Sequence, residues 1–221
     1  GWNVGVLEAE LESWRIIGTS EHTSIQTSLP DPNDHFYLSF GKSVTFQADR
    51  DFVIEADGPI SVGQFPSSQE VMGIPPHVDG GKDPPGGDPS FILVPPVEQW
   101  RSKYVFLVPN KYAYDFLLMA VPVGTKILYD DFPLSTVLQD CEYQPISKFK
   151  NSESATEYQA IRCPLSHPTV ENPNDPAFQD DGRHELESLD GQAFGLVVFG
   201  LDRYVSYGYP GGTNLAVINP D

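Results

Sequence analysis

The stretch GRHELESLDGQAFGLVVFGLDRYVSYGYPGG, residues 182–212, decides the fold. It joins two strand-like runs, RHELESL and FGLVVFGL, to a tyrosine- and glycine-rich segment, SYGYPGG. Apolar residues that alternate with polar ones over a short run are typical of a half-buried β-strand. Glycine and proline close together are typical of a turn. The stretch therefore predicts two β-strands followed by a tight closing turn.

The same kind of segment recurs along the rest of the chain. Short runs rich in Val, Ile, Phe, Tyr and Thr are separated by turns, and the chain holds 21 prolines and 19 glycines. This pattern predicts an all-β fold, an antiparallel β-sandwich. Residues 6–14 have some helical propensity, but we favour a strand there as well. Residues 42–65 faintly resemble residues 183–208, which favours two similar sandwich lobes packed together, although short strands also look alike by chance.

A proline- and glycine-rich segment, residues 72–90, divides the chain. Its composition resists regular structure, while strand-like runs stand on either side of it. We expect a first β lobe over residues 1–71, a loop or linker over 72–90 and a second β lobe over 91–221. The alternative is one domain over residues 1–221.

The charge balance argues against some partners. Thirty-one acidic residues face 13 lysines and arginines, which gives a formal net charge of −18. Nucleic acids and anionic membranes both attract basic surfaces, so we expect neither as a partner. No apolar run is long enough to span a bilayer, so we expect no membrane insertion by this segment. The acidic residues either serve solubility or gather Ca²⁺ or a basic partner.

Two cysteines, Cys141 and Cys163, flank a polar stretch with few helical signals. We expect a disulfide that staples this excursion and stabilises the fold by roughly 3 kcal/mol. The alternative is a pair of buried free thiols. An acidic, lysine-poor chain with a disulfide is typical of an exported protein, so we expect an extracellular or cell-surface location.

Recognisable catalytic motifs are missing from the sequence. The five histidines lie in no nucleophile motif, and no G-x-S-x-G segment occurs. His184 and Glu185 begin an H-E pair that lacks the second histidine of a zinc hydrolase. We therefore expect no enzyme and no cofactor, calcium apart. We interpret His184 as a structural residue that is hydrogen-bonded or faces solvent.

Two acidic loop segments, LPDPNDHF and ENPNDPAFQDDG, could supply oxygen ligands for Ca²⁺. Neither has the spacing of an EF-hand loop, and Asp, Asn and Pro are also common because they close turns. The candidate calcium ligands are Asp31, Asn33, Asp34, Asn174, Asp175, Asp180 and Asp181.

Tyrosines gather in the segment YVSYGYPGG. Tyrosine makes good contact surface in loops, but it also packs well in strands while its hydroxyl stays hydrated. We favour packing, with Gly208, Gly211 and Gly212 supplying positive φ or a close backbone approach. The candidate binding residues are Tyr204, Tyr207, Tyr209 and His184.

Four segments, in order, resemble the IgGFc-binding protein N-terminal domain family. They are PISVGQFPSSQE (59–70), GDPSFILVPPVEQWRSKYVFLVP (87–109), GRHELESLDGQAFGLVVFG (182–200) and SYGYPGG (206–212). The resemblance implies an extracellular, mostly β module with an adhesive or binding role, and it implies no catalytic residues.

The expected function is that of an extracellular, non-catalytic adhesion module that recognises a protein or a glycan. Edge strands and the loops around SYGYPGG and over residues 167–183 are the expected contacts, because loops on rigid β scaffolds carry binding. One alternative is a self-associating structural component of a surface matrix or filament. The other is a secreted hydrolase, which a pocket that joins a histidine, an acid and a nucleophile would support.

Overall fold

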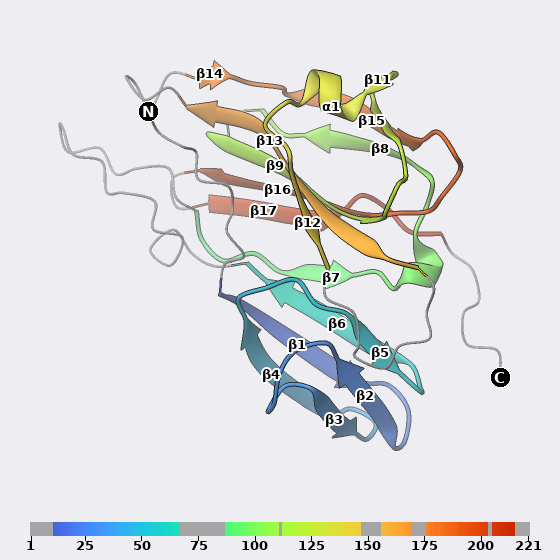
Figure 1. Cartoon of the computed structure of the whole chain (residues 1–221). Coiled ribbons are helices and arrows are strands. Elements are labelled where there is room, and N and C mark those ends of the chain that lie inside the picture. The colour runs from blue at the N-terminus through green and yellow to red at the C-terminus, as the bar shows by residue number, and fades with distance from the viewer. Residues whose placement is uncertain are drawn as a thin grey trace, which may run out of the picture.

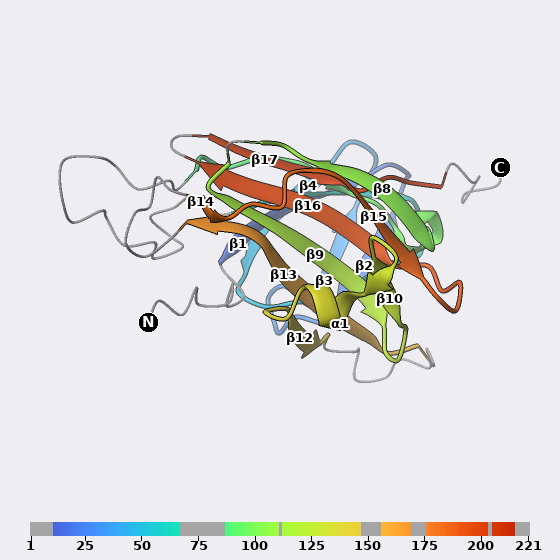
Figure 2. The ribbon, with the colours of Figure 1, turned by 90° about the horizontal axis from the view of Figure 1, so that it is seen from above.

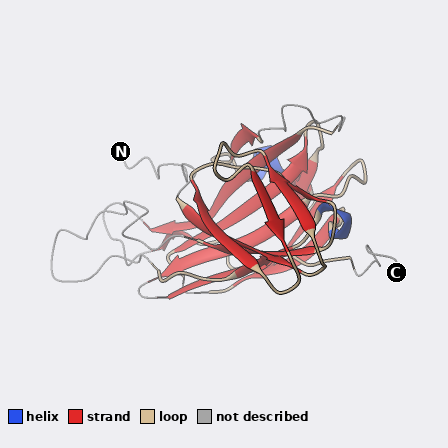
Figure 3. Ribbon diagram, turned by 90° about the horizontal axis from the view of Figure 1, so that it is seen from below, coloured by secondary structure: helices blue, strands red, loops and turns tan. Residues whose placement is uncertain are grey.

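The computed structural model describes residues 11–66, 87–110, 112–146, 156–168, 176–202 and 205–214. Strands dominate these residues, and the helices among them are short turns at the margins (Figures 1 and 3). The prediction of an all-β, antiparallel sandwich fold is confirmed. No helix in the described part of the chain has the length and apolar character needed to cross a membrane.

The first sandwich lies at the bottom of Figure 1. Its described strands are β1 (Glu12–Gly18), β2 (Thr23–Thr27), β3 (His35–Leu38), β4 (Ser43–Ala48), β5 (Ile54–Ala56), β6 (Ile60–Phe65) and β7 (Ile92–Val94). Sheet I has the order β4-β1-β6-β7 and sheet II the order β3-β2-β5, with antiparallel pairing throughout. Between the sheets lies an apolar core in which Ile16 and Ile25 are fully buried. The strand expected at residues 6–14 is β1 in its described part.

The second sandwich is larger. It contains β8 (Lys103–Val108), β9 (Tyr114–Pro122), β10 (Ile127–Tyr129), β11 (Phe132–Pro133), β12 (Glu142–Pro145), β13 (Tyr158–Pro168), β14 (Pro176–Phe178), β15 (Gly182–Ser188), β16 (Gly195–Asp202) and β17 (Val205–Pro210), with the short helices η1 (Val97–Gln99) and α1 (Leu134–Val137). Sheet III has the order β11-β10-β15-β8. Sheet IV has the order β12-β13-β9-β16-β17, and β14 pairs with β13. Figure 2 shows the long strands of sheet IV side by side.

Sheet IV is apolar on both faces. Along β9, Leu117 and Met119 point into the core between sheets III and IV, while Phe116 and Leu118 point the other way. Phe199 of β16 joins them on this outer face. A strand whose neighbours cover both faces reads as a continuous apolar run, which explains DFLLMAV in β9 and GLVVFGL in β16. The outer face of sheet IV is turned toward the first sandwich (Figure 1).

Strand β7 links the two sandwiches. Although its residues follow the segment 72–90, β7 pairs with β6 and so extends sheet I of the first sandwich. Ile92 of β7 also packs against β17, where a Cβ on Gly208 would lie only 2.7 Å from Ile92 Cδ1. Residues 67–86 lie outside the described part. The division into lobes 1–71 and 91–221 stays a prediction.

The prediction that the segment SYGYPGG forms a closing turn is wrong. Most of the segment is strand. Residues up to Pro210 belong to β17, which pairs antiparallel with β16 at the edge of sheet IV. Tyr207 and Tyr209 alternate with small residues, so the period of two that defines a strand runs through the segment. Gly212, just beyond the strand, has the positive φ of 138° that was expected of these glycines. Gly208 and Gly211 instead allow close packing against neighbouring side chains.

Candidate binding cleft

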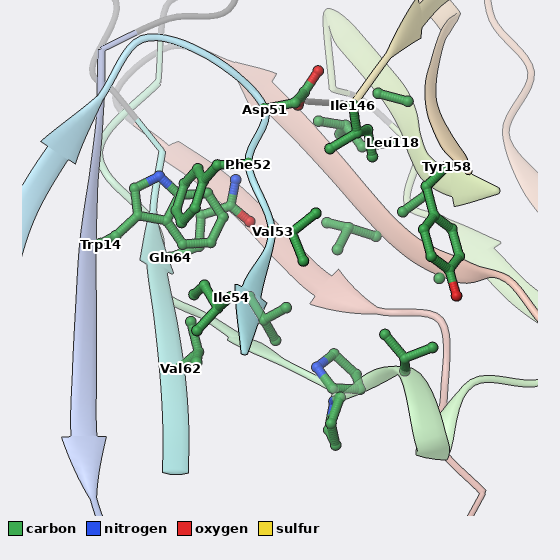
Figure 4. Close-up of a pocket in the computed structure, with 18 of the residues that line it drawn as sticks. Trp14, Asp51, Phe52, Val53, Ile54, Val62, Gln64, Leu118, Ile146 and Tyr158 are labelled. Atoms are coloured by element: carbon green, nitrogen blue, oxygen red, sulfur yellow. The ribbon is translucent and has the colours of Figure 1, made fainter. Parts of the chain in front are cut away.

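A cavity of about 890 Å³ opens between the two sandwiches (Figure 4). One wall comes from β1, β6 and the segment between β4 and β5. The other comes from β9, β13 and β16, that is, from the outer face of sheet IV. In Figure 4, Trp14 and Ile54 stand on the first wall, and Leu118 and Tyr158 stand on the second. We call this space the interlobe cleft.

Half-buried aromatic rings line the interlobe cleft on both sides. Trp14 meets Phe52 edge to face, with 4.9 Å between the ring centroids. Across the cleft, Trp100 meets Tyr158 edge to face at 5.7 Å. Aromatic and aliphatic side chains that stay partly exposed on a rigid scaffold are typical of ligand sites. These rings therefore supply an apolar contact surface that the fold itself does not fully cover.

Small residues form the floor of the interlobe cleft. Ala160, Ala120 and Gly195 lie side by side on β13, β9 and β16. The indole of Trp100 packs against Gly195 at one end of this row, since a Cβ added to Gly195 would lie 2.8 Å from its ring. The Trp100 Nε1–H donates to the Pro95 carbonyl at 3.3 Å, which fixes the ring. Because the side chains of the floor are small, space remains between the two sandwiches.

Two hydrogen-bonded pairs of polar side chains line the same cleft. Arg162 of β13 donates through Nη2 to Asp51 Oδ1 at 2.6 Å and so ties sheet IV to the first sandwich. The Arg162 side chain is 11% exposed and that of Asp51 is 24% exposed. Gln64 Nε2 donates to Glu12 Oε2 at 2.8 Å. Hydrogen bonds to charged groups are stronger than neutral ones, so the Arg162–Asp51 contact holds the two walls in register. The Gln64–Glu12 contact joins β6 to β1 within the first wall.

Glu12 has an unusual acidity in this setting. Burial raises the pKa of its carboxyl from 4.5 to about 7, while the hydrogen bond from Gln64 and the charge of Arg162 act in the opposite direction. The nearby carboxylate of Asp51 adds to the rise in pKa. Near neutral pH, Glu12 therefore exchanges between a neutral and a charged form inside the cleft.

Two of the tyrosines predicted as binding residues, Tyr207 and Tyr209, are hydrogen-bonded within the second sandwich. Tyr207 donates from its hydroxyl to Asp115 Oδ1 at 2.6 Å. The Tyr209 hydroxyl accepts from the Leu107 N–H at 3.1 Å and donates to the Leu107 carbonyl. Both rings pack against the core between sheets III and IV. Tyr204 lies outside the described residues.

His184 is buried in a hydrogen-bonded network away from the cleft. Its Nδ1 lies 2.7 Å from Asp130 Oδ2 and 2.8 Å from the Tyr129 hydroxyl, and its Nε2 lies 3.0 Å from the Asp180 carbonyl oxygen. The Tyr129 hydroxyl donates in turn to Asp180 Oδ2 at 2.5 Å. The side chain of His184 is 7% exposed, which fits a structural role in joining β10 to β15.

A serine hydroxyl and a histidine meet in the first sandwich. Ser24 Oγ lies 3.0 Å from His35 Nε2 across the β2–β3 pair. Within the described ranges, no carboxylate is hydrogen-bonded to His35, so the orienting acid that a nucleophilic triad needs is not part of this pair.

The predicted disulfide is confirmed. Cys141 and Cys163 are bonded, and they lie at the start of the β12–β13 pair, where Glu142 stands opposite Arg162. Cys163 is buried in the core of the second sandwich, while Cys141 packs against that core from outside. The bond therefore braces β13 next to the arginine that reaches into the interlobe cleft.

The candidate calcium ligands that the structure describes fall into two places. Asn33 and Asp34 lie in the turn between β2 and β3, where their backbone carbonyls accept from the Thr27 hydroxyl at 2.6 Å and the Thr27 N–H at 2.9 Å; Asp31 lies in the same turn. Asp180 belongs to the His184 network, and burial raises the pKa of Asp181 beside it.

Asn174 and Asp175 lie outside the described residues. In the part of the chain that the structure describes, His, Cys, Asp and Glu side chains form no group of three or more that could hold a metal ion. Calcium binding stays a prediction.

The sequence analysis missed the interlobe cleft, although a signal for it was present. The runs DFLLMAV in β9 and GLVVFGL in β16 do not alternate, which indicates strands that are apolar on both faces. Such strands need cover on two sides, and a second lobe is the natural source of the outer cover. The residues that make the polar part of the cleft, Glu12 and Asp51 above all, come from segments with no recognisable motif.

Comparison with known proteins gives one match. The family described as IgGFc binding protein matches the chain over residues 5–200. No curated protein and no solved structure matches the chain. The matched residues cover the first sandwich, most of the second and all the residues that line the interlobe cleft, so the chain belongs to the IgGFc binding protein family.

Proposed function

We propose that this chain is an extracellular, non-catalytic binding module that recognises a segment of a partner protein in the interlobe cleft. The observation that carries the proposal is the apolar space of about 890 Å³, open on two rigid sandwiches and lined by rings from both. Membership in the IgGFc binding protein family supports a protein ligand. The Cys141–Cys163 disulfide supports an oxidising, extracellular setting.

A protein segment suits the interlobe cleft better than a glycan. Aliphatic side chains such as Ile54, Val62 and Leu118 share the walls with the aromatic rings. Aliphatic groups pack well against apolar amino-acid side chains, whereas a sugar needs a dense set of hydrogen-bonding partners for its hydroxyl groups. Adhesion to a surface or matrix would follow if the partner is anchored there.

The test is to fill the cleft and measure binding. Ala120→Trp places a large ring on the cleft floor, and Val105→Trp places the same ring on the exposed side of β8 as a matched control. The probes are the Fc region of immunoglobulin G, which the family name suggests, and a random-peptide phage library. We expect Ala120→Trp to abolish binding to Fc or to the selected peptides and Val105→Trp to preserve it. Equal binding by a folded Ala120→Trp variant, or no binding to either probe, would contradict the proposal.

A further inference from the structure

The guanidinium of Arg162 holds an unused hydrogen-bond donor in the wall of the interlobe cleft. Nη2 is committed to Asp51, but Nη1 is buried and has no hydrogen-bond partner among the residues that the structure describes. A buried charged donor without a partner is costly, and such groups are rare in folded proteins. Arg162 Nη1 therefore lacks a hydrogen-bond acceptor from the fold. A ligand bound in the interlobe cleft would supply this acceptor.

The charges around Arg162 restrict what that acceptor can be. Asp51 already neutralises the guanidinium at 2.6 Å, and Glu12 interacts with it electrostatically from β1. Elsewhere on the lining, carboxylates outnumber arginines, with Glu55, Asp57 and Glu98 against Arg50. A ligand carboxylate would be repelled by these groups, whereas a neutral carbonyl would not be.

We infer that the interlobe cleft binds an extended peptide segment with apolar side chains, and that Arg162 Nη1 donates to a main-chain carbonyl of that segment. This inference rests on the proposed function. An extended peptide offers main-chain carbonyl groups between apolar side chains. One carbonyl could accept from the Arg162 donor while the side chains pack against the rings of Trp14, Phe52 and Tyr158. Nη1 is covered in the unliganded chain, so binding requires neighbouring side chains to move aside while the Arg162–Asp51 pair stays in place.

The experiment uses the capped tripeptide acetyl-Val-Phe-Val-amide, its free-acid form, and a neutral oligosaccharide of N-acetylglucosamine. Binding to the whole chain is followed by NMR through the indole N–H signals of Trp14 and Trp100. We expect the capped peptide to shift both signals, the free acid to bind several-fold more weakly, and the oligosaccharide not to bind. Arg162→Lys keeps a cation for Asp51 but lacks the second guanidinium nitrogen held in place by the planar fork, so it should weaken binding of the capped peptide about tenfold. Arg50→Lys, an exposed arginine at the same cleft, should change nothing.

Other results overturn the inference in distinguishable ways. Equal binding of the capped peptide to Arg162→Lys and to the unsubstituted chain would remove Arg162 as the donor, and a tighter free acid would reverse the charge argument. Binding of the oligosaccharide alone would replace the peptide by a glycan. If the capped peptide fails to bind while Ala120→Trp still abolishes Fc binding, the inference fails and the proposed function stands. If the peptide binds Ala120→Trp and the unsubstituted chain alike, both fail.

Discussion

The two faces of sheet IV carry the same kind of side chain but have different surroundings. On the inner face, Leu117 and Val198 are fully buried under sheet III. On the outer face, Leu118 and Val197 are only partly buried, because the first sandwich covers that face incompletely and leaves the interlobe cleft. The same apolar chemistry therefore makes a core on one side and a contact surface on the other, and the difference lies in what covers it.

Neighbouring leucines on β9 give the sharpest test of this comparison. Leu117→Ala should lower the free energy of unfolding by about 4 kcal/mol, because it leaves a cavity in a closed core. Leu118→Ala should lower it by about 1 kcal/mol, because its side chain borders an open space. Denaturant unfolding of both variants measures the difference. Equal losses would mean that the outer face is as well packed as the inner one.

The disulfide braces the inner face of sheet IV. Its loss should lower the free energy of unfolding by less than the loss of a core leucine. Replacing both cysteines, Cys141→Ser with Cys163→Ser, should cost about 3 kcal/mol, the value expected for a loop of this size. Thermal unfolding of the double variant and of the reduced parent chain checks it. A double variant as stable as the oxidised parent would show that β12 and β13 hold together by strand pairing alone.

Glu12 lies in the wall of the cleft that faces the outer face of sheet IV. We expect it to make the stability of the chain depend on pH. Its pKa is about 7 in the folded chain and 4.5 when unperturbed, so between these values the folded state binds more protons than the unfolded state. The free energy of unfolding therefore falls as pH rises from 4.5 to 7. Glu12→Gln removes this loss, so it should stabilise the chain by about 3 kcal/mol at pH 8 and have little effect below pH 4.5.

Asp115 contributes in the same direction, because burial raises its pKa from 3.8 to about 6. The quantity to compare is therefore the difference between Glu12→Gln and the parent chain at each pH, obtained from urea unfolding. A difference that does not change with pH would place Glu12 in water rather than in the cleft wall.

The smallest effect is expected at the edge of the second sandwich. Tyr209→Phe removes the hydroxyl that occupies both backbone groups of Leu107 on the edge strand β8. The loss should be about 1 kcal/mol of stability. Because an open strand edge invites pairing with another chain, the variant should also self-associate more at high concentration. Light scattering tests this, and an unchanged monomer would show that the edge is protected by other means.

Much of this architecture could be predicted from local pattern. The strand-rich runs, the turns and the Cys141–Cys163 bond all follow from residue types and spacing, because strand periodicity and loop closure are local properties. The strand β17 was misjudged because Gly208 and Pro210 resemble turn residues, while the packing of Ile92 against Gly208 is visible only in three dimensions. The cleft was missed for the same reason, since Asp51 and Arg162 meet at a sequence separation of 111 without any motif.

In the proposed function the ligand binds on the open outer face of sheet IV and not along the edge strand β17. Hydrogen exchange of the chain with and without the Fc region, or with a selected library peptide that binds, distinguishes these two surfaces. We expect new protection in residues 51–54 and 158–162, with residues 205–210 unchanged. Protection confined to residues 205–210, with no change along the cleft, would contradict it.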